Sequence, residues 1–346
     1  MTSLNDVLAG ISSVDGSVAA QARERIDGLA KPPHSLGRLE SLGVQLAAIA
    51  GCCPPPPPDP ARIVVVAGDH GVVAQGVTRW PSALSGVLAA TVAAGGAGVN
   101  VLAGVAGAQL RVLDAGLASA VPGVEAAVVR RGTGDLAVEA AMTRAEVLAA
   151  IELGIAEAER AAGDGVRCLA TGEVGIGNTT TAAALVAAFT GAPASEVAGR
   201  GADSPPEVVA HKGEVIGRAL ALHRPDPTDP IGVLAAVGGV EQAVLTGLVL
   251  GAARNRLPIL LDGVTGAAAG LAAVALCPAA CGYLIAAHAG AEPAIGVALD
   301  RLGLEPLLDL GLALGEGSGA ALALPIVRAA SAIMSEMATL ESLLPG

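Results

Sequence analysis

Short apolar runs alternate along the chain with longer Ala-rich segments. Three of the runs, at residues 63–67, 166–170 and 258–261, lead into loops that contain glycine, and each loop is followed by an Ala-rich helical pattern. A weaker fourth run covers residues 110–113. Runs of this kind are typical of parallel βα units whose strands are buried on both faces. The pattern predicts an α/β fold with a parallel sheet flanked by helices, Rossmann-like and doubly wound.

Both ends of the chain have helical rather than strand patterns. Residues 17–29 and 35–50 are predicted helices, the second with Ser35 as a candidate N-cap. A run of five prolines at residues 54–58 predicts a stiff spacer before the first strand. Beyond residue 303 the pattern is helical again, and in the apolar segment 319–340 Pro325 is expected to kink or restart the helix.

Composition excludes several classes of function. The chain has 346 residues, 53% of them hydrophobic, and a formal net charge of −12, with no run of Lys or Arg. Its only aromatic residues are Trp80, Phe189 and Tyr283. Because binding to nucleic acid needs positive potential or aromatic stacking surfaces, we expect no nucleic-acid partner. No secretory signal pattern precedes the five cysteines, which are odd in number, so we expect a cytoplasmic protein.

Two long stretches are apolar enough to raise the question of a membrane. Residues 80–110 and 263–291 contain no Asp, Glu, Lys or Arg. Ala and Gly, which transfer weakly into lipid, dominate both stretches, and Pro278 breaks the second. Neither is flanked by basic clusters or aromatic belts. The sequence therefore predicts no membrane span.

The most informative segment is Gly172-Glu173-Val174-Gly175-Ile176-Gly177-Asn178-Thr179-Thr180-Thr181, between a predicted strand and a predicted helix. Its glycines allow backbone N–H groups to approach an anion, and the helix start adds the positive end of its dipole. The segment has no Lys beside its Thr, so it suits a single phosphate monoester better than a Mg-bound triphosphate. The alternative is a tight strand-to-helix turn capped by Asn178 or Thr179, without a ligand.

Two charged residues are candidates for chemistry. Glu316 lies among glycines before an apolar helical segment, where it is either a general base or an ordinary residue of a first helical turn. Lys212 is one of two lysines, the other being Lys31. It either binds an anion or pairs with a nearby Glu on a helix surface.

The polar residues that follow the predicted strands do not form a metal-binding pattern. Asp69, His70, Asp262 and His288 are residue types that bind metals, but no two histidines have the spacing of a ligand motif. The cysteines lack CxxC spacing. We therefore expect no metal and no redox cofactor, and we expect these residues to organise a crevice by hydrogen bonds.

Several of these segments, taken together, make the chain resemble the nicotinate-nucleotide-dimethylbenzimidazole phosphoribosyltransferase family along nearly its whole length. The segments that carry the resemblance are Lys31-Pro32-Pro33, Ser35-Leu36-Gly37-Arg38-Leu39-Glu40, Ala67-Gly68-Asp69-His70-Gly71-Val72, residues 172–180, Gly238-Gly239 with Glu241, Leu261-Asp262-Gly263, His288 with Glu292-Pro293, and residues 307–321.

The resemblance implies an organisation and a set of partners. A small helical domain would combine residues 1–30 with residues 305–346, and residues 31–304 would form the α/β domain that binds nucleotide and base. The expected substrates are nicotinate mononucleotide and a benzimidazole-type base, without a cofactor, and the expected assembly is a homodimer.

The resemblance also implies a role for particular residues. Glu316 would be the general base, Asp262 would lie in the substrate site, and Glu173 and Lys212 would belong to the same site. The base pocket would draw on residues 81–87, which include Pro81, Ser85 and Val87, and on Leu314. The residues implied in holding the nucleotide phosphate are Gly175, Ile176, Gly177, Asn178, Thr179 and Thr180.

Two positions depart from the family pattern. His34 stands where the family usually has Gly, and Val87 stands where it has a Gln associated with the aromatic-base pocket. The second departure removes a hydrogen-bonding group. Two other functions remain open from the sequence: a phosphoribosyltransferase that uses another acceptor base, and a non-catalytic protein that binds the nucleotide or the base.

Overall fold

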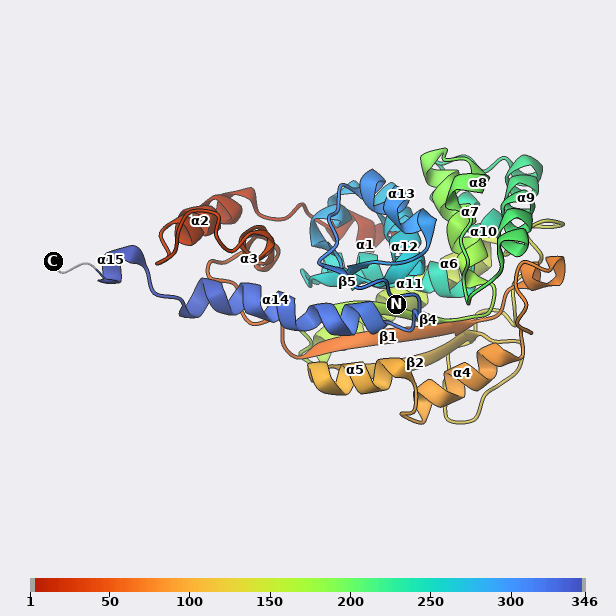
Figure 1. The fold of residues 1–346 in the computed structure, drawn as a ribbon, viewed down its shortest axis with the longest axis horizontal. Helices are drawn as coiled ribbons and strands as arrows, with labels where there is room; N and C mark the ends of the chain where they lie inside the picture. Colours follow the sequence, from red (N-terminus) through yellow and green to blue (C-terminus); the bar gives the residue numbers. More distant parts are fainter. Residues whose placement is uncertain (1–3, 344–346) are drawn as a thin grey trace.

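The computed structural model describes residues 4–343 and is built around a six-stranded parallel sheet (Figure 1). Its strand order is β3-β2-β1-β4-β5-β6, and every neighbouring pair is parallel. A separate two-stranded pair joins β7 and β8. The strands are β1 (Ala61–Gly68), β2 (Gln109–Gly116), β3 (Glu125–Ala126), β4 (Cys168–Val174), β5 (Ile259–Leu261), β6 (Leu284–Ala286), β7 (His288–Ala289) and β8 (Leu308–Asp309).

Helices cover both faces of the sheet. One face packs against α4 (Leu84–Ala93), α5 (Gly98–Ala106) and α14 (Ser318–Glu336), and the other packs against α6 (Arg144–Gly163), α7 (Asn178–Thr190), α11 (Val240–Arg254) and α12 (Gly263–Leu276). The remaining helices are α1 (Leu4–Gly10), α2 (Gly16–Asp27), α3 (Arg38–Ala50), η1 (Gly71–Gln75), α8 (Ala194–Val197), α9 (Pro206–His223), α10 (Pro230–Val237), η2 (Pro278–Tyr283), α13 (Pro293–Leu302) and α15 (Leu340–Leu343).

Strand β1 shows why its sequence is apolar without alternation. Successive side chains of a strand point to opposite faces of the sheet. Ile63 and Val65 accordingly join the core beneath α14, whereas Val64 and Val66 join the core on the side of α11. Since both cores exclude water, all four of these positions are apolar; only Arg62, near the start of the strand, is charged, and it reaches Asp164 at 2.8 Å. The predicted doubly wound α/β fold is confirmed.

The strand order also locates the binding crevice. The chain proceeds from β1 outward to β2 and β3, then returns to place β4 on the other side of β1. The loops that follow β1 and β4 therefore lead to opposite sides of the sheet. Parallel sheets bind ligands at such a point, outside the carboxyl ends of the strands. The loops after β1 and β4 begin at Asp69 and Gly175.

A helical layer extends beyond the sheet, at the left of Figure 1. It has its own small core, in which Val18, Ile26, Val44 and Met334 unite α2, α3 and the end of α14. Helix α1 instead packs against α11 and α6. The division into residues 1–30 with 305–346 and residues 31–304 stays a prediction; residues 1–3 and 344–346 at its two ends lie outside the described residues.

Some predicted boundaries move for local reasons. The helix expected from Ser35 begins at Arg38, because the preceding Gly37 has a φ of 54° and cannot belong to a right-handed helix. The weak run at residues 110–113 is the centre of the full strand β2. Pro325 remains inside the continuous helix α14. His34, the departure from the family's Gly, adopts a left-handed φ of 60°, which a glycine adopts without strain.

Two helical segments are long and apolar enough to cross a membrane by length and composition, Leu84–Ala106 and Ser318–Glu336. Both face the sheet in this fold. Ala89 and Val99 come from the first segment and Leu324 and Val327 from the second, and all four are buried in one core. The opposite side of the first segment is largely uncovered, since only 22% of its most apolar window is buried.

Close packing between α6 and α11 gives a test of this fold. A methyl group on Gly247 would overlap the carbonyl oxygen of Ile151, and one on Gly154 would overlap that of Val244. We expect Gly247→Ala to lower the free energy of unfolding by about 3 kcal/mol, because the helices must separate. Chemical denaturation measures the change.

The matched control is Gly296→Ala in α13, where the added methyl group meets nothing within 4 Å beyond the backbone of its own helix and its chain neighbours. Alanine should stabilise that exposed helical position by about 0.5–1 kcal/mol. Equal effects of the two substitutions would contradict the packing described for α6 and α11.

Candidate active site

Two adjoining cavities open at the carboxyl ends of β1, β4 and β5. The smaller has a volume of about 50 Å³ and the larger about 260 Å³. The residues that line both are Gly175, Ile176, Asn178, Thr179, Gly201 and Ala202. A ligand with one small end and one larger end would therefore fit across both cavities.

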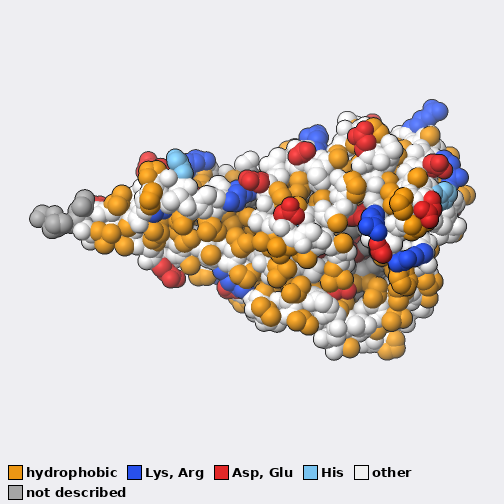
Figure 2. Space-filling view, in the orientation of Figure 1, with side chains coloured by type: hydrophobic (Ala, Val, Ile, Leu, Met, Phe, Trp, Pro, Cys, Tyr) orange, Lys and Arg blue, Asp and Glu red, His pale blue; other side chains and the backbone are white. Residues whose placement is uncertain are grey.

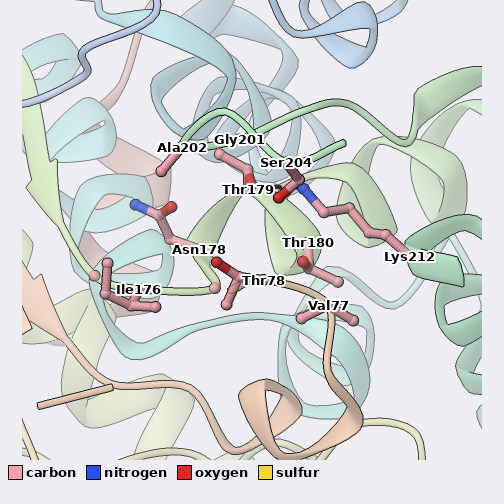
Figure 3. Close-up of a pocket in the computed structure, with 12 residues that line it drawn as sticks. Val77, Thr78, Ile176, Asn178, Thr179, Thr180, Gly201, Ala202, Ser204 and Lys212 are labelled. Atoms are coloured by element: carbon pink, nitrogen blue, oxygen red, sulfur yellow. Dashed lines mark hydrogen bonds between the residues drawn. The ribbon is translucent and has the colours of Figure 1, made fainter. Parts of the chain in front are cut away.

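The smaller cavity, shown in Figure 3, is formed around the start of α7. Gly177 is the N-cap of this helix and has a φ of 95°, a value that favours glycine. A side chain here would also meet Val73, 2.8 Å from its Cβ. The turn therefore directs the positive end of the helix dipole at the cavity. Within the described residues Asn178 N and Thr180 N donate to carbonyls of the turn itself, whereas no acceptor is found for the N–H groups of Gly177 and Thr179.

Side chains complete this polar cavity. The buried Thr180 hydroxyl has no hydrogen-bond partner among the described residues, which is unusual for a buried polar group and marks a place for a ligand. Lys212 is only 2% exposed, and its Nζ donates to Thr179 Oγ1 at 3.1 Å and to the Gly199 carbonyl at 2.8 Å. Figure 3 shows its ammonium group directed toward Thr179. The surface interpretation of Lys212 is therefore wrong.

Burial lowers the pKa of Lys212, and the nearby carboxylate of Glu292 opposes that shift. The same carboxylate accepts a hydrogen bond from Gly201 N at 2.6 Å. Glu292 thus stabilises both the ammonium group and the loop after α8 that forms one side of the two cavities. A buried cation beside the start of a helix is suited to a phosphate.

Glu316 lies in the wall of the larger cavity on an unusual stretch of backbone. Gly315, Glu316 and Gly317 all have positive φ, with 66° at Glu316 itself. Its Oε2 accepts a hydrogen bond from Val99 N at 3.2 Å, in the first turn of α5. Burial raises the pKa of Glu316 and Asp262 adds to the rise, whereas the Val99 hydrogen bond opposes it. A carboxylate of raised pKa in a cavity wall is suited to general-base catalysis.

Glu173, the second acid in this wall, is close to Glu316. Burial raises its pKa to about 8, and the charges of Glu241, Asp262 and Glu316 contribute to the rise. Its carboxyl group also accepts a hydrogen bond from the Asn178 side chain. At neutral pH the proton is therefore mostly retained on Glu173.

Asp262 lies behind the wall of the larger cavity. Its carboxylate accepts hydrogen bonds from Gly317 N at 3.1 Å and from Ala320 N at 2.8 Å. His288 approaches the same carboxylate at 3.4 Å. Asp262 thereby caps the first turn of α14 and orders the segment that carries Glu316.

The predicted base-pocket residues separate into two groups. Leu314 lines the larger cavity, as does Leu88 of α4. Ser85 is buried beside it and accepts a hydrogen bond from Ile176 N at 2.9 Å. Pro81 and Val87 are outside the lining and exposed, Val87 to 59%.

No sequence signal indicates some of the residues that line the cavities. Glu292, another lining residue, is named above only as part of the segments that resemble the family. Gly201, Ala202 and Ser204 follow a helix rather than a strand, so no strand-end rule indicated them. The segment Lys31 to Glu40 lies at neither cavity and is held by the Lys31–Glu40 ion pair at 2.8 Å. Within residues 4–343 no group of three His, Cys, Asp or Glu side chains is arranged to hold a metal ion.

Comparison with known proteins shows the family to which the chain belongs. A family model described as phosphoribosyltransferase matches residues 11–343. A nicotinate-nucleotide-dimethylbenzimidazole phosphoribosyltransferase of Salinispora tropica is 48% identical over 98% of this chain and 98% of its own, and one of a Roseiflexus species is 46% identical over 98% and 97%.

A solved structure bearing that enzyme's name, from Thermus thermophilus, superimposes with a TM-score of 0.90 at 41% identity. It covers 96% of this chain and 100% of its own. Since both the family model and these relatives span nearly the whole sequence, the chain belongs to the nicotinate-nucleotide-dimethylbenzimidazole phosphoribosyltransferase family.

Proposed function

We propose that the protein transfers ribose 5-phosphate from nicotinate mononucleotide to 5,6-dimethylbenzimidazole or a related base. The products are alpha-ribazole 5'-phosphate and nicotinate, and the reaction serves assembly of the cobalamin lower ligand. The observation that carries the proposal is the pair of adjoining cavities, one polar around Thr180 and Lys212, the other bordered by Glu316. The names of the relatives supply the substrates.

The chemistry needs one base and no dedicated acid. Nicotinate is joined to ribose through a positively charged ring nitrogen, so it leaves with a neutral nitrogen and needs no proton donor. The acceptor attacks with one ring nitrogen, and the N–H on its other nitrogen becomes acidic as positive charge develops. Glu316 takes that proton. Direct displacement inverts the configuration at the anomeric carbon, and fixing phosphate and base on opposite sides of the sugar supplies the orientation.

Protonation of Glu173 supports this assignment. A second ionised carboxylate beside Glu316 would make the site strongly negative and would oppose binding of the phosphate. Because the pKa of Glu173 is raised to about 8, its neutral form prevails at pH 7, and it adds no second negative charge beside Glu316 in the cavity wall. No metal or redox cofactor is required for any of these steps.

Aliphatic side chains of the larger cavity determine which acceptor base fits. Leu88, Val264, Leu312 and Leu314 line it, and Val87 stands exposed outside it. This favours flat aromatic bases selected by shape over bases selected by edge hydrogen bonds, and it makes a different acceptor base the second candidate. Nicotinate release measured with a panel of benzimidazoles and purines distinguishes the candidates. Absence of release with every base would identify a non-catalytic binding protein instead.

We further propose that the protein is a cytoplasmic homodimer without membrane or nucleic-acid partners. Support for the dimer comes from the uncovered side of α4 and α5, where Val87, Val101 and Val105 are exposed. In Figure 2 hydrophobic side chains gather along the lower edge of the molecule, over these two helices. An apolar surface of this kind fits a second copy of the chain.

Glu316→Gln should lower kcat by about 10²- to 10⁴-fold with little change in nicotinate mononucleotide affinity, because the amide keeps the shape but cannot accept the proton. Single-turnover kinetics and calorimetry separate the two quantities. The control is Glu305→Gln, whose side chain is 76% exposed. Near-normal turnover of Glu316→Gln at saturating substrates would disprove the assigned role.

Thr180→Val should weaken binding of nicotinate mononucleotide by about 10-fold and leave binding of nicotinate riboside, which lacks the phosphate, unchanged. The fold should be unaffected, because the hydroxyl has no partner to lose within the described structure. Calorimetry with both ligands is the measurement, and Thr190→Val near the other end of α7 is the control. Equal losses for the two ligands would place the phosphate elsewhere.

The dimer proposal predicts that Val101→Lys with Val105→Glu produces monomers, because both side chains, 64% and 82% exposed, lie one helical turn apart on α5. Sedimentation velocity measures the change. Val138→Glu, at an equally exposed valine away from α5, should leave the dimer intact. A monomeric wild-type protein would overturn the proposal.

A further inference from the structure

A buried ion pair beneath the phosphate turn has no role in the chemistry described so far. His70, in the loop after β1, has its Nε2 3.3 Å from Oε1 of Glu241, in the first turn of α11. Both side chains are fully buried. Neither ring nitrogen of His70 and neither oxygen of Glu241 has a hydrogen-bond partner among residues 4–343. Such a pair is costly to bury, so its position calls for an explanation.

The pair is oriented, with His70 toward the turn. A Cβ on Gly175 would stand 3.1 Å from Nε2 of His70, and a Cβ on Gly177 would stand 3.4 Å from the Cβ of His70. Glu241 instead faces the end of β1, where a Cβ on Gly68 would stand 3.1 Å from its Oε2. The imidazole of His70 therefore packs directly behind the backbone of the turn, and the carboxylate of Glu241 lies farther from the turn.

The groups around the imidazole favour its charged form. Burial by itself lowers the pKa of His70, but the carboxylate of Glu241 and the charge of Asp69 outweigh it and raise the pKa. Asp69 is the other acid facing the ring, and one of its oxygens is engaged by Ala118 N at 2.8 Å. The positive pole of the pair therefore faces the turn while its negative pole faces the sheet.

We propose that His70 is a positioning residue for the nucleotide phosphate, acting from behind the turn of Gly175 to Gly177 without touching the ligand. Its imidazolium, oriented by Glu241, supports the turn that carries the N–H groups of Gly177 and Thr179, which have no acceptor within the described residues, and it adds positive potential behind them. The proposal rests on the placement of the phosphate in this turn under the proposed function. In an acidic chain whose smaller cavity contains one lysine, a second cation behind the backbone strengthens anion binding.

Two variants remove the charges without leaving one unpaired. Glu241→Gln leaves a neutral imidazole beside an amide, and His70→Gln combined with Glu241→Gln leaves two amides of similar shape. We expect each to raise the dissociation constant for nicotinate mononucleotide by about 5- to 10-fold. Binding of nicotinate riboside and the KM for dimethylbenzimidazole should stay within twofold. Calorimetry, steady-state kinetics and thermal melting measure these quantities.

The control is Arg111→Gln combined with Glu157→Gln, which neutralises another partly buried pair, between β2 and α6. It should change stability alone. A folded variant at the His70–Glu241 pair that binds nicotinate mononucleotide as wild type does, or loses both ligands equally, would overturn the proposal. Failure of both variants to fold would assign the pair to the fold and would also overturn it. Absence of nicotinate release from the wild-type protein would instead contradict the proposed function, so the two proposals fail in different experiments.

Discussion

The site depends above all on the carboxylate of Asp262, which joins the end of β5 to the start of α14. Its two oxygens accept hydrogen bonds from Gly317 N and Ala320 N, 55 and 58 residues further along the chain. These bonds bring the start of α14 to the carboxyl end of the sheet and satisfy donors that the helix start leaves free. The strained segment before the helix is then fixed from both sides, with Glu316 between two left-handed glycines. Without this cap the proposed base would have no defined position.

Crowding of acids around the crevice follows from the same geometry. Glu173, Glu241, Asp262 and Glu316 come from four different elements and converge because the parallel strands end at one edge. Each has a different compensation. Asp262 accepts backbone hydrogen bonds, Glu241 is paired with His70, Glu316 caps α5, and Glu173 has its pKa raised to about 8. The site tolerates four carboxyl groups because three are compensated and the fourth is mostly neutral at pH 7.

The sequence predicted the parts of this arrangement that depend on local pattern. Buried strands with glycine loops indicated the parallel sheet, and the Gly175 to Thr180 turn was recognised before a helix that does begin at Asn178. Burial of Lys212 was undecided, because a helical pattern does not show which neighbouring element covers a given face. Strand β6 has three residues and offered no periodicity. The loop that includes Gly201 follows a helix, and its approach to the turn is a long-range contact that local pattern cannot predict.

Small residues explain how these elements approach so closely. Gly172 has no room for a side chain, since a Cβ would stand 2.6 Å from the carbonyl oxygen of Glu316, and a Cβ on Gly315 would stand 2.5 Å from Oε1 of Glu173. Glu173 and Glu316 can therefore approach each other because each of the two backbone segments has a glycine at the point of contact. On its other side the base cavity is lined by aliphatic residues such as Leu88 and Leu314. Aliphatic walls reward the area and flatness of a base more than its edge pattern, so discrimination among acceptors falls to shape and to the proton-accepting position of Glu316.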